Sequence, residues 1–94
     1  MSAKGTFILQ YQKAQGGKSA PAAVIKAACL YTLDLKIAGL SLDEITTRLE
    51  DLMRAAGGLT PETARLDADI MLHCVEEYHR PLPRSIPKPP DFIG

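Results

Sequence analysis

The chain has 94 residues, 46% of them hydrophobic, and its 11 Lys and Arg residues balance 11 Asp and Glu residues to a formal net charge of zero. This length allows one domain at most, and the apolar fraction excludes a chain that is disordered throughout. The charge is segregated, with +3 on residues 1–19 and −4 on residues 60–79, so the second half of the chain is poorly suited to contact a phosphate backbone.

The first predicted element is an extended arm or strand. In residues 6–12, TFILQYQ, the side chains of Phe7, Leu9 and Tyr11 fall on one face with a period of two. No second strand pattern follows, so this strand would need a partner from another copy or another protein. Residues 13–19 contain two adjacent glycines and are typical of a loop. Residues 1–19 are therefore predicted to form an extended arm and a loop.

The segment from Pro21 to Leu40 predicts a helix of about five turns that is apolar nearly all round. Only four polar side chains interrupt it. Pro21 suits the first helical position, and Gly39 suits the left-handed residue that commonly closes a helix. Such a helix must be covered on several sides, and the rest of this short chain provides limited cover. We therefore expect this helix to be the central element, and we expect a homodimer that buries part of it.

Two further helices complete a predicted three-helix core over residues 20–79, and they are expected to pack on the first as an antiparallel hairpin. Ser41 and Glu44 form the capping-box pattern that opens a helix, and Gly57 follows its end. Its apolar stripe consists of Leu42, Ile45, Leu49, Leu52, Met53 and Ala56. Thr60 and Pro61 are predicted to open the third helix. Its apolar stripe consists of Ala64, Ala68, Met71, Val75 and Tyr78, and Ile70 and Cys74 widen it on one side.

The last segment, residues 80–94, is rich in proline and is predicted to be an extended tail. Residues 84–90, RSIPKPP, match the RxxPxxP pattern of ligands for SH3 domains. A solvated tail explains the same composition, because short proline patterns arise by chance. The fold class predicted for residues 1–94 is thus a single, mostly α domain with three helices, an N-terminal arm and a C-terminal tail.

No pattern in the sequence identifies a reaction, so we expect no enzyme, no catalytic residue and no cofactor. Residues 16–19, GGKS, resemble the end of a phosphate-binding loop, but Gln12 stands where the first glycine of that motif belongs. His73 and His79 lie near the end of the third predicted helix, but at a spacing of six residues they point to different sides. No metal site is therefore predicted.

The two cysteines, Cys29 and Cys74, fall in apolar helical surroundings and are expected to be buried thiols, with a disulfide as the alternative. The N-terminal residues lack the apolar core of a signal peptide. The apolar run at residues 27–33 is too short to span a bilayer. We expect a cytoplasmic protein with no membrane partner.

Two DNA-binding arrangements are alternatives. Residues 33–49 resemble a helix-turn-helix, with a glycine-containing turn between two helices. The order of a strand and helices is also similar to the ribbon-helix-helix fold, in which Thr6, Gln10 or Gln12 would face bases. The acidic side chains on the helix that would enter the major groove argue against the first. The long loop at residues 13–19 and the third helix depart from the second.

The function that these patterns favour is a small, non-enzymatic regulatory or adaptor protein that binds another protein, with inhibition of that partner as one mode of action. The alternative is a sequence-specific DNA-binding transcriptional regulator. Nucleic acid is the less favoured partner because of the charge distribution. Aromatic side chains concentrate binding energy, so the residues expected to contact the partner are Phe7, Leu9, Tyr11, Tyr31 and Tyr78.

Overall fold

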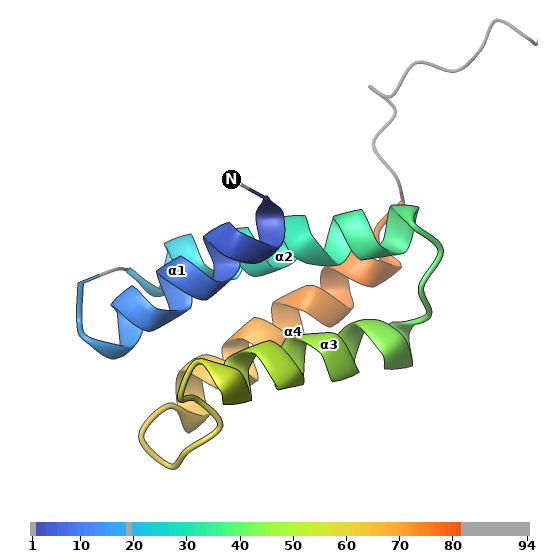
Figure 1. Cartoon of the computed structure of the whole chain (residues 1–94). Coiled ribbons are helices and arrows are strands. Elements are labelled where there is room, and N and C mark those ends of the chain that lie inside the picture. The colour runs from blue at the N-terminus through green and yellow to red at the C-terminus, as the bar shows by residue number, and fades with distance from the viewer. Residues whose placement is uncertain (1, 19, 82–94) are drawn as a thin grey trace, which may run out of the picture.

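The computed structural model of the chain describes residues 2–18 and 20–81, and within these ranges every regular element is a helix. The four helices are α1 (Ala3–Gln15), α2 (Pro21–Ile37), α3 (Leu42–Ala55) and α4 (Ala64–His79) (Figure 1). The predicted mostly α fold is therefore confirmed, but the described residues form four helices rather than three. None of the helices in the described ranges has the length and apolarity that crossing a membrane requires.

The predicted N-terminal arm or strand is wrong, because residues 3–15 form α1. The Ser2 hydroxyl caps this helix by accepting a hydrogen bond from the Gly5 N–H at 3.1 Å. Phe7 and Tyr11 are four residues apart, so a helix places them on one face, and both are fully buried. Leu9, which a strand would place on the same face, is 37% exposed. The i, i+4 spacing of Phe7 and Tyr11 therefore defines the buried face of α1.

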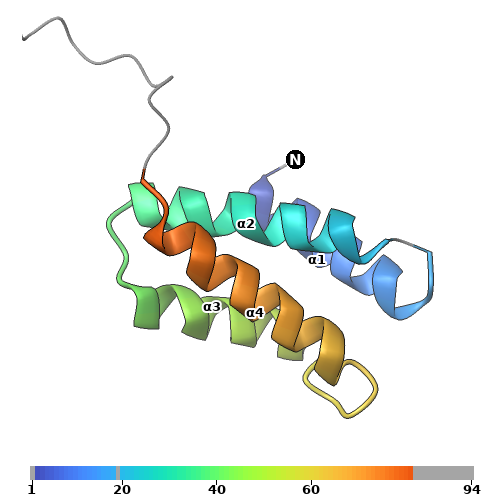
Figure 2. The same cartoon turned by 180° about the vertical axis from the view of Figure 1, so that it is seen from behind.

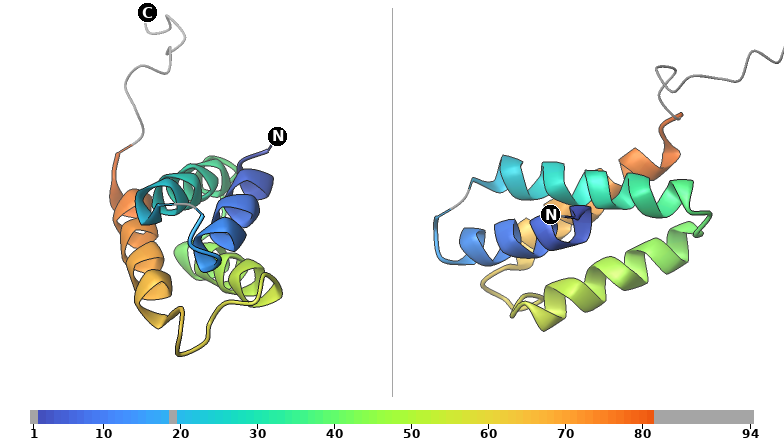
Figure 3. Two further views of the ribbon diagram at one scale, coloured as in Figure 1. Left: turned by 90° about the vertical axis from the view of Figure 1, so that its left-hand side faces the viewer. Right: turned by 45° about the horizontal axis from the view of Figure 1, so that its top comes forward.

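Helix α2 is the central element, as predicted, because it packs against each of the other three helices. It begins at Pro21 and is followed by Gly39 with a φ of 95°, which agrees with the start and stop signals in the sequence. Seen along its axis, α2 has α1 on one side and α4 on the other (Figure 3, left). Figure 2 shows α4 crossing the side of the domain that is opposite α1. One side of α2 remains open to solvent.

Helix α3 follows its predicted pattern closely. The Glu44 N–H donates to the Ser41 hydroxyl at 3.2 Å, and the Ser41 N–H donates to the Glu44 carboxylate at 2.8 Å, which completes the capping box. The centre of the apolar stripe is fully buried at Ile45, Leu49 and Met53. The helix is thus fixed at its start by side-chain hydrogen bonds and along its length by burial.

Helix α4 begins at Ala64, three residues after the predicted start, because Thr60 and Thr63 first form a turn of their own. The helix is also rotated relative to the predicted stripe. Its buried residues are Asp67, Ile70 and Cys74, whereas Ala64 and Ala68 are exposed. A carboxylate lies on the buried face, which an apolar pattern cannot indicate. The proline-rich segment from residue 82 onward, with the SH3-ligand pattern, lies outside the described residues.

The aromatic centre of the core joins α1 to α2. The Phe7 ring lies 5.9 Å from the Tyr11 ring and 6.4 Å from the Tyr31 ring, measured between centroids. Aromatic pairs at such separations add to the stability that their burial provides. Since the chain has no Trp and only two Phe, this trio supplies most of the large aromatic surface of the core.

We expect Phe7→Ala to lower the free energy of unfolding by about 3–5 kcal/mol, because it removes a fully buried ring and leaves a cavity. For a chain of this size such a loss is a large part of the total stability. Urea unfolding followed by circular dichroism measures the change. Leu9→Ala on the same helix is the control and should cost about 1 kcal/mol or less, since that side chain is partly exposed. Equal losses in the two variants would contradict the helical α1.

Candidate protein-binding surface

The residues predicted to contact a partner do not form one surface. Phe7 and Tyr11 are 0% exposed and Tyr31 is 7% exposed, so the structure brings these three together inside the core. They cannot touch a partner without leaving that core. Leu9 and Tyr78 are accessible in part and lie on different helices. For these two residues, the binding role stays a prediction.

Tyr78 connects the ends of α2 and α4. The ammonium of Lys36 lies 5.5 Å from the centroid of the Tyr78 ring, within the range of a cation–π contact. The same ammonium donates a hydrogen bond of 2.6 Å to the Arg80 carbonyl, and the Arg80 guanidinium lies 2.7 Å from the Glu77 carboxylate. The two Lys36 contacts hold the C-terminal end of α4 against α2, whereas the Glu77–Arg80 pair lies within the end of α4 itself.

A buried polar cluster connects α1 to the segment between α3 and α4. The Tyr11 hydroxyl donates to one oxygen of Asp67. The other Asp67 oxygen accepts from the Leu59 N–H at 3.0 Å and from the Thr63 hydroxyl at 2.7 Å. Within the described residues, no buried side-chain nitrogen or oxygen lacks a hydrogen-bond partner. Because both carboxylate oxygens are occupied by donors of the chain itself, we interpret this cluster as structural.

Burial changes the protonation of Tyr11. The pKa of its hydroxyl rises from 10.0 to about 12, first because burial disfavours the phenolate and then because the Asp67 carboxylate accepts its proton. Gly58 lies directly against this hydroxyl, and a Cβ atom at that position would overlap the ring of Tyr11. The turn after α3 can therefore approach α1 this closely only with glycine at position 58.

The two cysteines are free thiols at the contact of α2 with α4. Cys74 is fully buried, and burial raises the pKa of its thiol to about 12. Cys29 is half-buried, and burial, followed by the charge of Glu77, raises its pKa as well. Both thiols therefore stay protonated at neutral pH, a form that is a poor nucleophile. Cys74 is thus buried as expected, whereas Cys29 is only half-buried, and the two form no disulfide in the structure.

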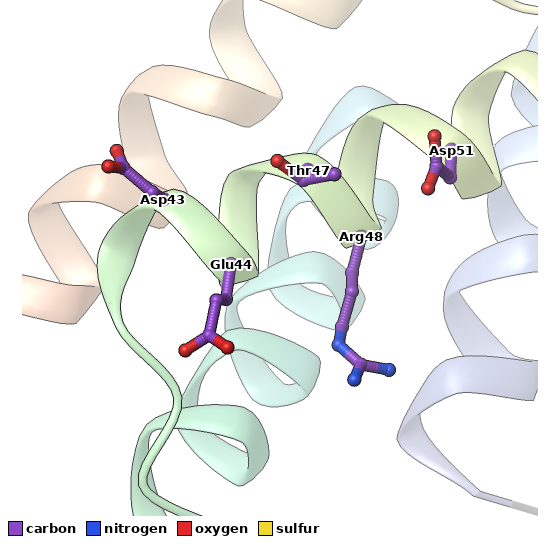
Figure 4. A pocket seen from close by; sticks show the side chains of 5 residues that line it. All are labelled: Asp43, Glu44, Thr47, Arg48 and Asp51. Atoms are coloured by element: carbon purple, nitrogen blue, oxygen red, sulfur yellow. The ribbon is translucent and has the colours of Figure 1, made fainter.

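The outer face of α3 has a shallow hollow whose side chains all come from that one helix (Figure 4). Glu44 and Arg48 point to one side of the helix, while Asp43 points away from them (Figure 4). Hydrogen bonds from Ser41 lower the pKa of Glu44, so this carboxylate is committed to the capping box. The side chains do not converge on one point where a substrate atom would react. With three carboxylates and one guanidinium, the face also repels phosphate.

The outer face of α2 has different properties, because large apolar side chains are exposed there. Leu30 is 49% exposed and Ile37 is 57% exposed. Leu30 belongs to a row of residues spaced four apart along the helix, which we call the α2 ridge. All five of its members are exposed: Ala22, Lys26, Leu30, Asp34 and Ala38.

Hollows lie on both sides of the α2 ridge, and Leu30 lines both. The hollow between α2 and α4 has a volume of about 330 Å³ and includes Leu33 and His73. The hollow toward α1 has a volume of about 270 Å³ and includes Thr6 and Ala27. The ridge thus stands between two depressions, a shape that another helix can fit. The apolarity of residues 21–40 indicated this helix in the sequence but did not indicate which face stays open.

Metal ligation and similarity to known proteins provide no further assignment. Among the described residues, no three His, Cys, Asp or Glu side chains are grouped in a way that would hold a metal ion. The Nδ1 atom of His73 lies 2.8 Å from the Asp69 carbonyl oxygen of the same helix. Comparison of the chain with protein-family models, with curated proteins and with solved structures finds no match.

We expect Gly58→Ala to lower the free energy of unfolding by about 1–3 kcal/mol, because the added methyl group would force the Tyr11 ring to move from Asp67. Gly16→Ala is a matched control. A Cβ atom there would lie 3.7 Å from its nearest neighbour, the Lys13 carbonyl oxygen, which is an ordinary contact. Urea unfolding measures both variants. If Gly58→Ala proved as stable as Gly16→Ala, the close approach of the turn to α1 would be disproved.

Alkaline pH should destabilise the domain through Tyr11. The folded-state pKa of about 12 lies above the ordinary value of 10.0, so the contribution of Tyr11 is complete below pH 10 and is lost between pH 10 and pH 12. Over this range the unfolding free energy of the wild type should fall more steeply than that of Tyr11→Phe. Urea midpoints measured at several pH values test this. Parallel curves would show that Tyr11 has the same pKa in the folded and unfolded chains.

Proposed function

We propose that this chain is a small, non-enzymatic regulatory or adaptor protein that acts by binding another protein chain through the outer face of α2. The observation that carries the proposal is the exposure of Leu30 and Ile37 on a helix whose other sides are packed against α1, α3 and α4. Covering such side chains removes apolar surface from water, which stabilises a complex by about 25 cal/mol per Å² before the costs of association.

The surroundings of this face support a protein ligand. Charged side chains border the apolar centre, with Lys26 on α2 and Glu76 and Arg80 on α4. An apolar centre with a polar rim is the usual anatomy of a protein–protein interface. The hollows on both sides provide room for side chains of the ligand. Inhibition of the bound protein remains one mode of action within this proposal.

The DNA-binding alternative has less support. The ribbon-helix-helix arrangement depends on a strand at residues 6–12, which are helical. The helix-turn-helix arrangement would direct the outer face of α3 at DNA, and Asp43, Glu44 and Asp51 lie on that face. Phosphate contacts supply most of the affinity of such proteins, so this distribution of charge disfavours it.

We expect Leu30→Glu to abolish capture of the partner by the tagged protein, because it places a carboxylate at the centre of the apolar face. Leu72→Glu is the matched control, since Leu72 is 57% exposed and lies on α4. Affinity capture from lysate of the source cell, with and without nuclease, provides the measurement. Both variants should keep the helical content of the wild type.

The outcomes separate the two functions. A protein that survives nuclease treatment, is lost with Leu30→Glu and is kept with Leu72→Glu supports the proposal. Equal capture by Leu30→Glu and the wild type removes the α2 face from it. Capture of DNA by the wild type, falling steeply with salt concentration, would establish the DNA-binding alternative.

A further inference from the structure

The α2 ridge has a charge pattern that is its own complement. Lys26 precedes Leu30 by four residues, and Asp34 follows it by four, so opposite charges stand at equal distances on either side of one leucine. Ala22 and Ala38 end the row on both sides. Among the described residues, neither the Lys26 ammonium nor the Asp34 carboxylate forms a hydrogen bond or ion pair within the chain. Both charges are available to a ligand.

From this pattern we infer that the ligand of the α2 ridge is a second copy of the same chain, packed antiparallel about Leu30. The inference rests on the proposed function in one respect, namely that the ridge is a protein-binding surface. A twofold axis beside Leu30 relates the two copies. A residue that precedes Leu30 in one copy then lies opposite the residue that follows Leu30 by the same number of positions in the other copy. Lys26 of each copy then lies beside Asp34 of the other.

The geometry of helix packing agrees with this arrangement. The commonest crossing of two helices, at about −50°, places rows of residues spaced four apart side by side. The α2 ridge is such a row, and all of it is exposed. Under this crossing the two ridges run antiparallel and adjacent. Each Leu30 enters a hollow beside the ridge of the other copy, and the hollows of about 330 Å³ and 270 Å³ provide that space.

The pattern also disfavours the parallel alternative. In a parallel pair Lys26 would face Lys26, and Asp34 would face Asp34, and like charges placed together strongly disfavour a complex. An antiparallel pair instead forms two equivalent ion pairs. The alanines at the ends of the ridge allow close approach, so Ile37 of one copy can cover Ala22 and Ala23 of the other. A partner that binds the same ridge would compete with the second copy.

The test is sedimentation equilibrium of the full chain over a wide concentration range. The wild type should show a reversible monomer–dimer equilibrium. Lys26→Asp alone and Asp34→Lys alone should each weaken association more than about tenfold, because each variant places like charges together at both sites of the dimer. Because Lys26 and Asp34 are both exposed, circular dichroism should show that each variant keeps the helical content of the wild type.

Mixing the two variants is the decisive measurement. In a mixed dimer, the carboxylate introduced at position 26 of one variant meets the ammonium introduced at position 34 of the other. At the second site, the native Asp34 of the first variant meets the native Lys26 of the second. Both ion pairs return, so an equimolar mixture should dimerise like the wild type although each variant alone does not. Lys18→Asp and Glu50→Lys are matched controls, because they reverse exposed charges outside α2 and should leave association unchanged.

Three results would overturn the inference: a wild type that is monomeric at all concentrations, a dimer that either ridge variant leaves intact, or a mixture that fails to associate. The proposed function is judged separately. A monomeric wild type whose capture of a different protein depends on Leu30 refutes the second copy and keeps the protein-binding function. A dimer that obeys the charge rules, with capture of a different protein unaffected by Leu30→Glu, supports the second copy and refutes the α2 face as the adaptor site.

Discussion

The contact between Tyr11 and Asp67 is the interaction on which the arrangement of this domain depends. A carboxylate without partners would be costly inside a protein, and here the hydroxyls of Tyr11 and Thr63 and the Leu59 N–H satisfy it. The contact fixes the rotation of α4, because Asp67 must face the core. It also fixes the position of α1, since the ring of Tyr11 packs against Phe7 while its hydroxyl reaches the turn after α3. One polar cluster therefore sets the relative positions of three helices.

Helix α2 is held in place by a different kind of contact, namely the packing of its apolar side chains. Small side chains at Ala27 and Ala28 are buried, and they let the neighbouring helices approach closely. Within residues 2–18 and 20–81, three other helices are available to cover a helix that is apolar on nearly every side. They cover it on three sides and leave the α2 ridge exposed. The apolarity of α2 thus serves the core on one side and is available for association on the other.

The sequence predicted the elements whose signals are local. The capping box of Ser41 and Glu44 and the stop at Gly39 appear where expected, because a few neighbouring residues determine each. The N-terminal strand was wrong because Phe7, Leu9 and Tyr11 satisfy a period of two, while the pair Phe7 and Tyr11 also satisfies a helical period. The lone strand without a partner was the available warning. The rotation of α4 depends on a partner 56 residues away in the sequence, Tyr11 for Asp67, which no local pattern contains.

For the candidate surface, the sequence indicated the helix but not the face of it that stays exposed, because the exposed face depends on contacts between residues far apart in the chain. The apolarity of residues 21–40 identified the helix, but the choice of Phe7, Tyr11 and Tyr31 as contacts overlooked the need of a small core for large side chains. With no Trp in the chain, the core uses the aromatic residues that an interface would otherwise use. The open face of α2 becomes visible only when the positions of α1 and α4 are known.

The contacts at the end of α4 have a consequence for how this helix can unwind. Lys36 on α2 holds the Arg80 carbonyl, and Glu77 holds the Arg80 side chain, so the backbone leaves the four-helix body at an anchored point next to the end of α2. Unwinding of α4 from its C-terminal end must therefore break contacts with α2 as well as the hydrogen bonds of its own last turn. The lysine that holds the Arg80 carbonyl also lies over the Tyr78 ring, so one side chain of α2 opposes this unwinding at two points.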